Sequence, residues 1–460
     1  MDIKIFNSLS RKKETFIPLK PNQVKIYTCG PTVYDVAHIG NFRAFVFEDF
    51  VKRVFQLAGF SVYHVMNITD VDDRTILRSQ DRGVSLSELT DIYTKRFFDD
   101  LALLKVIPAD VYPRATKHIA EMIAMIEDLL SENHAYQTSD GSIYFALNSF
   151  QDYGQLTRVD MMQQQTTERI QEDEYSKDNP QDFALWKSWK PEDGDVYWDS
   201  PWGKGRPGWH IECSAMSTKY LGNHFDIHCG GVDNMFPHHE NEIAQSVCAT
   251  GEPFVNVWIH NEHLLVDGGK MSKSLGNFYT IQDLIDQGFS SEMLRYLLLS
   301  THYHSKVNFS LSKKHEALQA IQRIRDFQDR IQDIPHRRTE KLPAAFDRFL
   351  GALVDDFDAP GALGVFYAWI KEMNSRLDRQ SFTPDDIAEA DHFLERFNAV
   401  FDFSPKPEEI PDEVRQMVAE REAARRDKNW SLSDEIRDRL KAMGWLVKDT
   451  PGGTKCSKIE

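Results

Sequence analysis

A strand–helix–strand pattern near the start of the chain constrains the fold more than any other feature. β-rich runs at residues 23–29 and 61–66 flank a helical pattern at 43–58. The helical stretch gathers large apolar residues on one face: Phe47, Phe50, Val51, Val54 and Phe55. Such a unit builds a parallel sheet, and ligands bind at the carboxyl ends of its strands. The sequence therefore predicts an α/β fold.

Length and composition bound the class of protein. A chain of 460 residues is too long for one core, so two or three domains are expected. No run is apolar enough to span a membrane, and the start does not resemble a signal peptide. Five irregularly spaced cysteines favour a reduced, cytoplasmic compartment over a disulfide framework. The net charge of −17 argues against non-specific nucleic-acid binding but allows a specific RNA partner.

The sequence His38-Ile39-Gly40-Asn41 lies where the first helix is expected to begin. A helix N-terminus offers free N–H groups and a positive dipole end, which suit a phosphate. Gly40 lacks a Cβ atom and would let a nucleotide approach the backbone, and His38 can donate to a phosphate oxygen. From these residues alone, a simple turn before a core helix is an equally good interpretation.

Thiols, imidazoles and carboxylates gather further along the chain in a pattern that suits a metal. His238 and Glu242 are four residues apart and would share a helix face, but His239 and Glu242 are three apart and would also serve. Cys213 adds one thiolate and Cys29 a second, from the end of the first strand. Two sulfurs, one imidazole and one carboxylate suit zinc. For each residue alone, a buried cysteine or a capping histidine is the simpler interpretation.

A lysine loop follows a strand-like run at residues 254–265. Gly268-Gly269 leads into Lys270-Met271-Ser272-Lys273-Ser274, and Gly276 closes the loop. Two lysines on a loop hinged by glycines can close over a triphosphate and neutralise it. A solvated lysine loop is the common alternative.

The remaining patterns outline the rest of the chain. Residues 85–110 and 113–133 show helical periodicity, and 135–147 is typical of a hairpin that turns at Asp140-Gly141. Residues 161–180 are polar and predict a solvent-facing insertion, and the aromatic run at 183–209 predicts an irregular segment.

After residue 310 the patterns become mainly helical. They are interrupted by proline-rich linkers at 335–343 and 403–411. The tail predicts a small unit with a helix at about 433–443, a strand at 445–447, a Pro-Gly-Gly turn and a last short strand.

Taken together, the short motifs resemble a known family. The pair formed by His38 to Asn41 and Lys270 to Ser274 is similar to the paired signature of class I aminoacyl-tRNA synthetases. The detail resembles cysteinyl-tRNA synthetases at four stretches: residues 28–35, 67–70, 207–216 and 237–246. The resemblance extends from near Phe16 to the last dozen residues. It implies a Rossmann-like catalytic domain that carries one zinc ion, held by Cys29, Cys213, His238 and Glu242.

The resemblance also implies a two-step reaction. L-Cysteine and ATP would give cysteinyl-adenylate, with zinc selecting cysteine through its thiolate, and tRNA(Cys) would then accept the cysteinyl group. Thr69 and Trp209 match positions of the amino-acid pocket. His38, Lys270 and Lys273 would stabilise phosphate charge, with Mg²⁺ bridging the phosphates. The residues expected to hold ATP are Gly40, Asn41, Gly230, Gly231, Asp233 and Lys273.

The implied domain organisation follows the family. Residues 1–310 would form the catalytic domain, with a connective insertion at about 110–205 and a stem-contact region at about 265–310. Residues 311–402 would form a tRNA-binding helical bundle, and 412–460 a small α+β module that reads the anticodon. In that module the matching residues are Arg425, Trp430, Asp434 and Asp449. Trp430 suits stacking on a base, but a core position in the module is an equally good interpretation.

Three residues depart from the family pattern. Asn41 replaces the second histidine of the signature, Cys229 stands where glycine is usual, and Cys456 replaces a tryptophan near the C-terminus. The closest alternative function is a ligase that uses the same core to join cysteine to a small amine, but the long segment after residue 310 favours tRNA. A zinc-stabilised RNA-binding protein without catalysis would need no triphosphate clamp. We expect a monomer.

Overall fold

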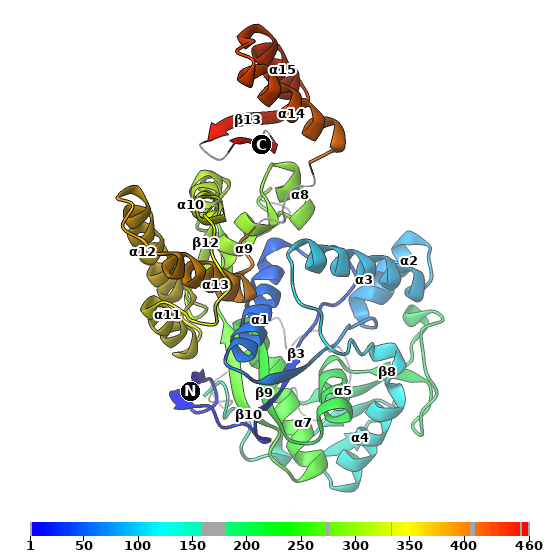
Figure 1. Ribbon diagram of the computed structural model, residues 1–460. Helices are drawn as coiled ribbons and strands as arrows, with labels where there is room; N and C mark the ends of the chain where they lie inside the picture. Colours follow the sequence, from blue (N-terminus) through cyan, green and yellow to red (C-terminus); the bar gives the residue numbers. More distant parts are fainter. Residues whose placement is uncertain are drawn as a thin grey trace.

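The computed structural model describes residues 2–158, 181–272, 276–332, 334–404, 410–450 and 453–458. At its centre lies a four-stranded sheet in the order β10–β9–β3–β4, and every neighbouring pair is parallel (Figure 1). The strands are β3 (Gln23–Thr28), β4 (Ser61–Met66), β9 (Phe225–Gly231) and β10 (Val255–Asn261). The α/β prediction and both early strands are confirmed.

Helix α1 (Ile39–Leu57) connects β3 to β4. All five residues of its predicted apolar face are buried. The helix begins four residues before the apolar pattern that starts at Arg43, and so at the His38–Asn41 stretch where its start was expected. His38 and Asn41 form a capping box that satisfies its first backbone N–H groups. Since β3 has β4 on one side and β9 on the other, the chain leaves the carboxyl edge of the sheet in two directions, which opens a crevice there.

Between β4 and β9 lies a long insertion. Its second sheet, β5–β6–β7–β8, is antiparallel and contains the predicted hairpin. The prediction of an irregular segment at 183–209 is wrong in part, because two strands of this sheet lie there and Trp186 is completely buried. The polar insertion predicted at 161–180 lies outside the described residues. The elements between β4 and β9 are α2 (Asp73–Arg82), α3 (Leu86–Leu103), α4 (Ile119–Ser131), β5 (Ala135–Gln137), β6 (Ile143–Phe145), β7 (Phe183–Ser188), β8 (Gly205–Pro207) and α5 (Trp209–Leu221), and those from α4 to β8 lie within the insertion predicted at about 110–205.

Smaller elements complete this region. Strands β1 and β2 form an antiparallel pair, and β11 and β12 a parallel pair. Their bounds, with those of the helices, are β1 (Lys4–Asn7), β2 (Lys12–Thr15), α6 (Val232–Asn234), α7 (Glu240–Thr250), β11 (Leu264–Val266), α8 (Ile281–Asp286), α9 (Ser291–Leu299) and β12 (Val307–Phe309).

A helical bundle follows, and its core is continuous with that of the parallel sheet. Phe366 and Phe397 stack with ring centroids 3.6 Å apart, which joins two of its helices. The bundle comprises α10 (Lys314–Gln332), α11 (Ala344–Val354), α12 (Ala359–Asp378) and α13 (Pro384–Phe401). Helix α13 packs against α1, so the bundle rests directly on the helix that connects β3 to β4 (Figure 1).

The C-terminal module has a small core of its own, formed by Val414, Met417, Ile436, Leu440 and Trp445. Its elements are α14 (Asp412–Arg426), α15 (Trp430–Ala442), β13 (Trp445–Thr450) and β14 (Gly453–Lys458), and the two strands are antiparallel. The predicted helix and two strands of the tail are confirmed. Figure 1 shows the module at the opposite end of the molecule from α4 and α5. Within the described residues, no helix is long and apolar enough to cross a membrane.

Candidate active site and metal centre

Four of the predicted ligand atoms converge at the carboxyl edge of the parallel sheet. Cys29 directly follows β3, Cys213 lies on α5, His238 precedes α7 and Glu242 lies in the first turn of α7. Their thiol, imidazole and carboxylate atoms all lie within 4.8 Å of one another, and all but Cys29 are buried. The structure therefore brings Cys29 together with three residues that lie 184 to 213 positions further along the chain.

The geometry of this group fits a soft divalent cation. Cys29 Sγ lies 3.9 Å from Cys213 Sγ and 3.9 Å from Glu242 Oε1, and His238 Nε2 lies 3.1 Å from Glu242 Oε1. The contact with Cys213, burial and the charge of Glu242 raise the pKa of Cys29, and the pKa of Cys213 is also raised. Packing two thiols against a buried carboxylate without a cation costs free energy, and zinc suits this donor set.

A second set of candidate ligands overlaps the first at Cys29 and Glu242, and adds His228 and His239. His239 Nε2 lies 3.5 Å from Cys29 Sγ, and His228 Nε2 lies 3.0 Å from Glu242 Oε2. The sequence interpretation did not identify His228, since it lies within a buried strand with no ligand spacing around it. Both His238 and His239 thus face the group, and the set with two thiols suits zinc better.

Burial keeps four histidines near the candidate ligands, His210, His238, His239 and His260, in the neutral form. Burial lowers the pKa of His210, His238 and His260 to about 3. His238 Nδ1 lies 2.8 Å from His210 Nδ1, and His239 Nδ1 lies 2.8 Å from His260 Nε2. Each pair shares one N–H, which fixes the ring orientations, and a neutral imidazole is the form that ligates metals.

The expected amino-acid pocket lies beside the candidate metal centre. Trp209 stacks on His238 with ring centroids 4.3 Å apart and is 42% exposed, so one face of it is open to a ligand. Thr69 Oγ1 accepts a hydrogen bond from Asn67 Nδ2 (3.1 Å) and donates one to Glu212 Oε2 (3.0 Å). Glu212 is completely buried, and the sequence interpretation missed it because a carboxylate on a helix usually faces solvent.

The two signature stretches meet at the start of α1. His38 caps the helix through Nδ1, which accepts from the backbone N–H of Asn41, and Asn41 Oδ1 accepts from the backbone N–H of His38 in return. A Cβ atom at Gly40 would lie 3.0 Å from the Met271 methyl, which places the lysine loop against this turn. Lys270 is exposed there, and Lys273 lies outside the described residues.

The paired glycines at the end of β9 lie in close contact with side chains that follow them, and at Gly230 the neighbour is the buried His239 ring, which cannot easily move. A Cβ atom at Gly230 would lie 2.6 Å from His239 Cε1, and one at Gly231 would lie 2.4 Å from Asp233 Oδ1. The exposed Asp233 thus sits directly after the sheet edge that carries the candidate metal centre. The departure at Cys229 places a buried thiol in the same strand.

The C-terminal module gathers three of its four predicted RNA-binding residues. The Arg425 guanidinium lies 5.6 Å above the Trp430 ring, and its Nη1 lies 3.1 Å from Asp449 Oδ2. Asp434 is paired with Arg437 instead, at 3.1 Å. Trp430 is 54% exposed, so its interpretation as a core residue is wrong.

Arg421, which the sequence interpretation missed, holds Asp449 of this group in place. Its guanidinium donates to both oxygens of Asp449, at 2.7 and 2.9 Å, although the arginine itself is 3% exposed. The hydrogen bond from Arg421 lowers the pKa of Asp449 to about 2. A fixed carboxylate therefore orients Arg425 beside the open face of Trp430.

Comparisons with known proteins agree with this geometry. The family model of the tRNA synthetases class I (C) catalytic domain matches residues 15–323, the DALR domain matches 348–403, and the cysteinyl-tRNA ligase anticodon binding domain matches 408–455. The cysteine–tRNA ligase of Chlamydia felis is 46% identical over 470 residues, which cover 100% of this chain and 98% of that protein. The cysteine–tRNA ligase of Brachyspira hyodysenteriae is 45% identical and covers 99% of each chain.

Solved structures share the fold at low sequence identity. The methionyl-tRNA synthetase of Mycobacterium tuberculosis in complex with methionyl-adenylate superposes with a TM-score of 0.58 at 12% identity, over 83% of this chain and 90% of that one. The LeuRS–tRNA–LeuAMS complex from Agrobacterium radiobacter gives a TM-score of 0.62 at 11% identity, over 84% and 85%. Both confirm the Rossmann-like architecture of a class I synthetase with helical C-terminal parts.

Proposed function

Because this chain belongs to the cysteine–tRNA ligase family of class I aminoacyl-tRNA synthetases, we propose that it activates L-cysteine with ATP and transfers the cysteinyl group to tRNA(Cys). One observation carries the proposal most directly. The thiol–imidazole–carboxylate group and the pocket residue Trp209 share the sheet edge at which α1 presents its N-terminus. Amino acid and nucleotide can therefore meet in one crevice, as adenylate formation requires.

Cys29, Cys213, His238 and Glu242 would hold one Zn²⁺ ion. When bound, zinc would lower the pKa of the substrate thiol and favour sulfur over the harder hydroxyl of serine. His228 would orient Glu242 through its second oxygen, and His210 would orient His238 through Nδ1. Thr69 and Trp209 would line the amino-acid pocket beside the candidate metal centre, with the Thr69 hydroxyl held in place by Asn67 and Glu212.

The nucleotide would lie against the start of α1. Gly40, Asn41, Gly230, Gly231, Asp233 and Lys273 would bind ATP, with its phosphates at the positive end of the α1 dipole. His38, Lys270 and Lys273 would stabilise the charge that develops on the phosphates as the cysteine carboxylate attacks the α-phosphate, and Mg²⁺ would supply further positive charge to them. No protein nucleophile is needed, because positioning and electrostatics lower the barrier.

The helical bundle and the C-terminal module would bind the tRNA. We assign catalysis to residues 1–310, with the insertion at about 110–205 and a stem contact at about 265–310. Residues 311–402 and 412–460 would hold the tRNA and its anticodon, with Arg425, Trp430, Asp434 and Asp449 reading bases of a single-stranded loop. The reduced thiols of the candidate metal centre fit the cytoplasmic location that the cysteine content predicts.

Transfer of radiolabelled cysteine to total tRNA by the purified protein tests this function. The proposal expects acid-precipitable label that requires ATP and is lost when zinc is removed with a chelator and restored when zinc is returned. Cysteine-dependent pyrophosphate exchange without any labelled tRNA would contradict it and favour a ligase that joins cysteine to a small amine. Labelling that survives complete removal of zinc would contradict the metal assignment.

A further inference from the structure

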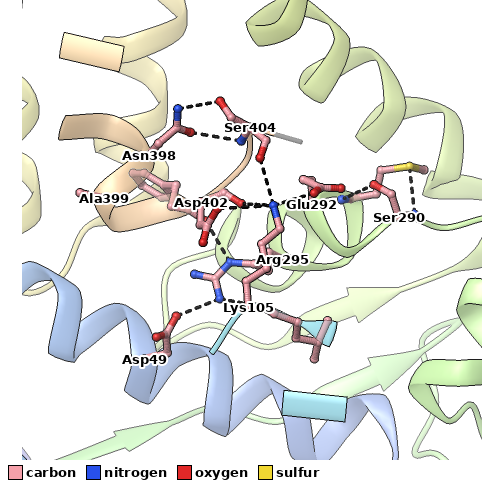
Figure 2. Close-up of polar contacts among 12 residues, drawn as sticks. Asp49, Lys105, Ser290, Glu292, Arg295, Asn398, Ala399, Asp402 and Ser404 are labelled. Atoms are coloured by element: carbon pink, nitrogen blue, oxygen red, sulfur yellow. Dashed lines mark hydrogen bonds and ion pairs between the residues drawn. The ribbon is translucent and has the colours of Figure 1, made fainter. Parts of the chain in front are cut away.

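A group of six charged side chains joins the sheet region to the helical bundle, and Figure 2 shows most of its members. We call it the junction cluster. Its acids are Asp49, Glu292 and Asp402, and its bases are Arg53, Lys105 and Arg295. Most of these side chains are buried, and three negative charges balance three positive ones. Because removing one partner leaves an uncompensated buried charge, such a cluster holds its elements in one arrangement.

A single carboxylate ties three segments together. Asp49 on α1 accepts from Arg53 Nε at 2.8 Å and pairs with Arg295 Nη1 at 2.8 Å through Oδ2, while its Oδ1 accepts from the backbone N–H of Ile107 at 2.8 Å. Arg295 belongs to α9, the second helix after the lysine loop. Helix α1 and the segment that follows the lysine loop are thereby fixed to one another.

The bases of the cluster hold the C-terminal end of α13. Arg53 Nη1 donates to the Ala399 carbonyl at 3.1 Å, and Arg295 Nε donates to the Phe401 carbonyl at 2.9 Å. The last carbonyls of a helix lack intrahelical partners and form the negative end of its dipole, so two guanidinium groups stabilise this end strongly. The bundle is thus fastened to α1 and α9 at the last turn of α13.

Lys105 connects two acids of the cluster, Glu292 on α9 and Asp402 just after α13. Its Nζ lies 2.6 Å from Glu292 Oε1 on α9, donates to the Ser404 carbonyl at 3.0 Å and lies 3.4 Å from Asp402 Oδ1 (Figure 2). Its backbone has φ of +57°, the left-handed conformation that commonly ends a helix, and Lys105 follows the C-cap of α3. Lys105 therefore reaches from α9 to the chain that leads out of the bundle toward the C-terminal module.

We propose that Lys105 is a positioning residue for the tRNA-dependent step. Through the junction cluster it sets the position of the bundle, and of the C-terminal module that follows it, relative to the start of α1. Transfer of cysteine to tRNA needs that placement over the whole length of the molecule, whereas adenylate formation needs only the crevice at the sheet edge. This inference rests on the proposed function.

The test compares Lys105→Met with the wild type in two assays. Methionine keeps the unbranched shape and most of the length of the side chain and removes its charge. We expect kcat/KM for tRNA to fall about tenfold while cysteine-dependent pyrophosphate exchange changes by less than about twofold. Lys105→Arg should restore most of the transfer activity, because it returns the cation. Lys95→Met, at an exposed lysine of α3 that pairs with Asp99, is the matched control and should match the wild type in both assays.

Each outcome separates the inference from the function on which it rests. If the wild-type protein does not charge tRNA, the proposed function fails before any variant is compared. If the wild type charges tRNA and Lys105→Met does so equally well, the inference is wrong. A parallel fall in exchange and transfer would also overturn it, because the cluster would then serve only the stability of the catalytic region. Should Lys105→Met not fold, Glu292→Gln removes the partner charge with little change of shape. It should likewise lower kcat/KM for tRNA and leave pyrophosphate exchange nearly unchanged.

Discussion

Gly40 and Met271 touch across the start of α1: a Cβ atom at Gly40 would lie 3.0 Å from the Met271 methyl and 3.0 Å from the His38 ring. The first helical turn and the lysine loop are therefore packed against each other, although some 230 residues separate them in the chain. An added methyl group would push both the His38 ring and the loop away from the position in which they face a nucleotide.

We therefore expect Gly40→Ala to raise KM for ATP by about tenfold or more, since misplacement by a fraction of an ångström at such a site is costly. The melting temperature should change little. Pyrophosphate exchange at varied ATP concentration provides the measurement. Gly351→Ala in α11 is the matched control, because a Cβ atom there meets nothing within 4 Å and alanine is the better helix former. Equal KM values for Gly40→Ala and Gly351→Ala would show that the close packing at Gly40 does not affect ATP binding.

Replacing Cys213 by serine should remove zinc and cysteine activation together, because a hydroxyl is a poor ligand in a site built around thiolates. Metal content measured by mass spectrometry and cysteine-dependent exchange should fall in parallel. Cys248→Ser is the control, since Cys248 belongs to neither candidate ligand set among the described residues. A Cys213→Ser protein that forms cysteinyl-adenylate at nearly the wild-type rate would contradict the zinc assignment.

The lysine loop should act on phosphate charge and not on the amino acid. Lys273→Ala is expected to slow adenylation about a hundredfold, the usual effect of removing one group that stabilises transition-state charge. The dissociation constant for cysteine should stay the same. Single-turnover adenylation and equilibrium cysteine binding separate the two quantities, with the exposed Lys12→Ala as control. A large rise in the cysteine dissociation constant would show that the lysine has another role.

The exposed face of Trp430 should bind a tRNA base. Trp430→Ala is expected to weaken tRNA binding by about 1–3 kcal/mol, the range for loss of one stacked base, and to leave pyrophosphate exchange intact. Trp430→Phe should keep most of the affinity. Leu446→Ala serves as control, because Leu446 is a similarly exposed apolar residue of the same module, at 52% against 54%. Equal losses for Trp430→Ala and Leu446→Ala would mean that the effect comes from the module's stability.

Glu48 makes stability depend on pH. Burial raises the pKa of this α1 carboxyl to about 8, so the folded protein holds a proton that the unfolded chain releases at its ordinary pKa. The free energy of unfolding should therefore fall by about 1.4 kcal/mol per pH unit from that ordinary pKa up to pH 8 on account of this group. Glu48→Gln should lose less thermal stability between pH 6 and pH 8 than the wild type. If it loses as much as Glu127→Gln, an exposed control, this role of Glu48 is wrong.

The local elements of the fold and the short motifs could be predicted because their signals are local. Two β-rich runs around an apolar helical face give β3, α1 and β4, and a cluster of turn residues gives the hairpin of β5 and β6. The start of α1 lies at the His38–Asn41 stretch, as expected, although the apolar pattern by itself begins only at Arg43, because the capping by a histidine–asparagine pair is not visible in that pattern. The strand β7 was missed because its burial on both faces erases the alternation that marks a strand.

By itself, the sequence determined which elements form and which residues carry the chemistry. These are the turn at His38, the lysines of the loop, and the thiols of Cys29 and Cys213 with the carboxylate of Glu242. Only the tertiary structure decided how they combine. In the folded chain His228 and His239 lie at the candidate metal centre, and the buried Glu212 accepts a hydrogen bond from Thr69. Arg421 donates to Asp449, and Lys105 pairs with Glu292, nearly two hundred residues further along the chain. The reason is physical, since these contacts are between segments far apart in the chain, and both their charge states and their strength depend on burial that no local pattern encodes.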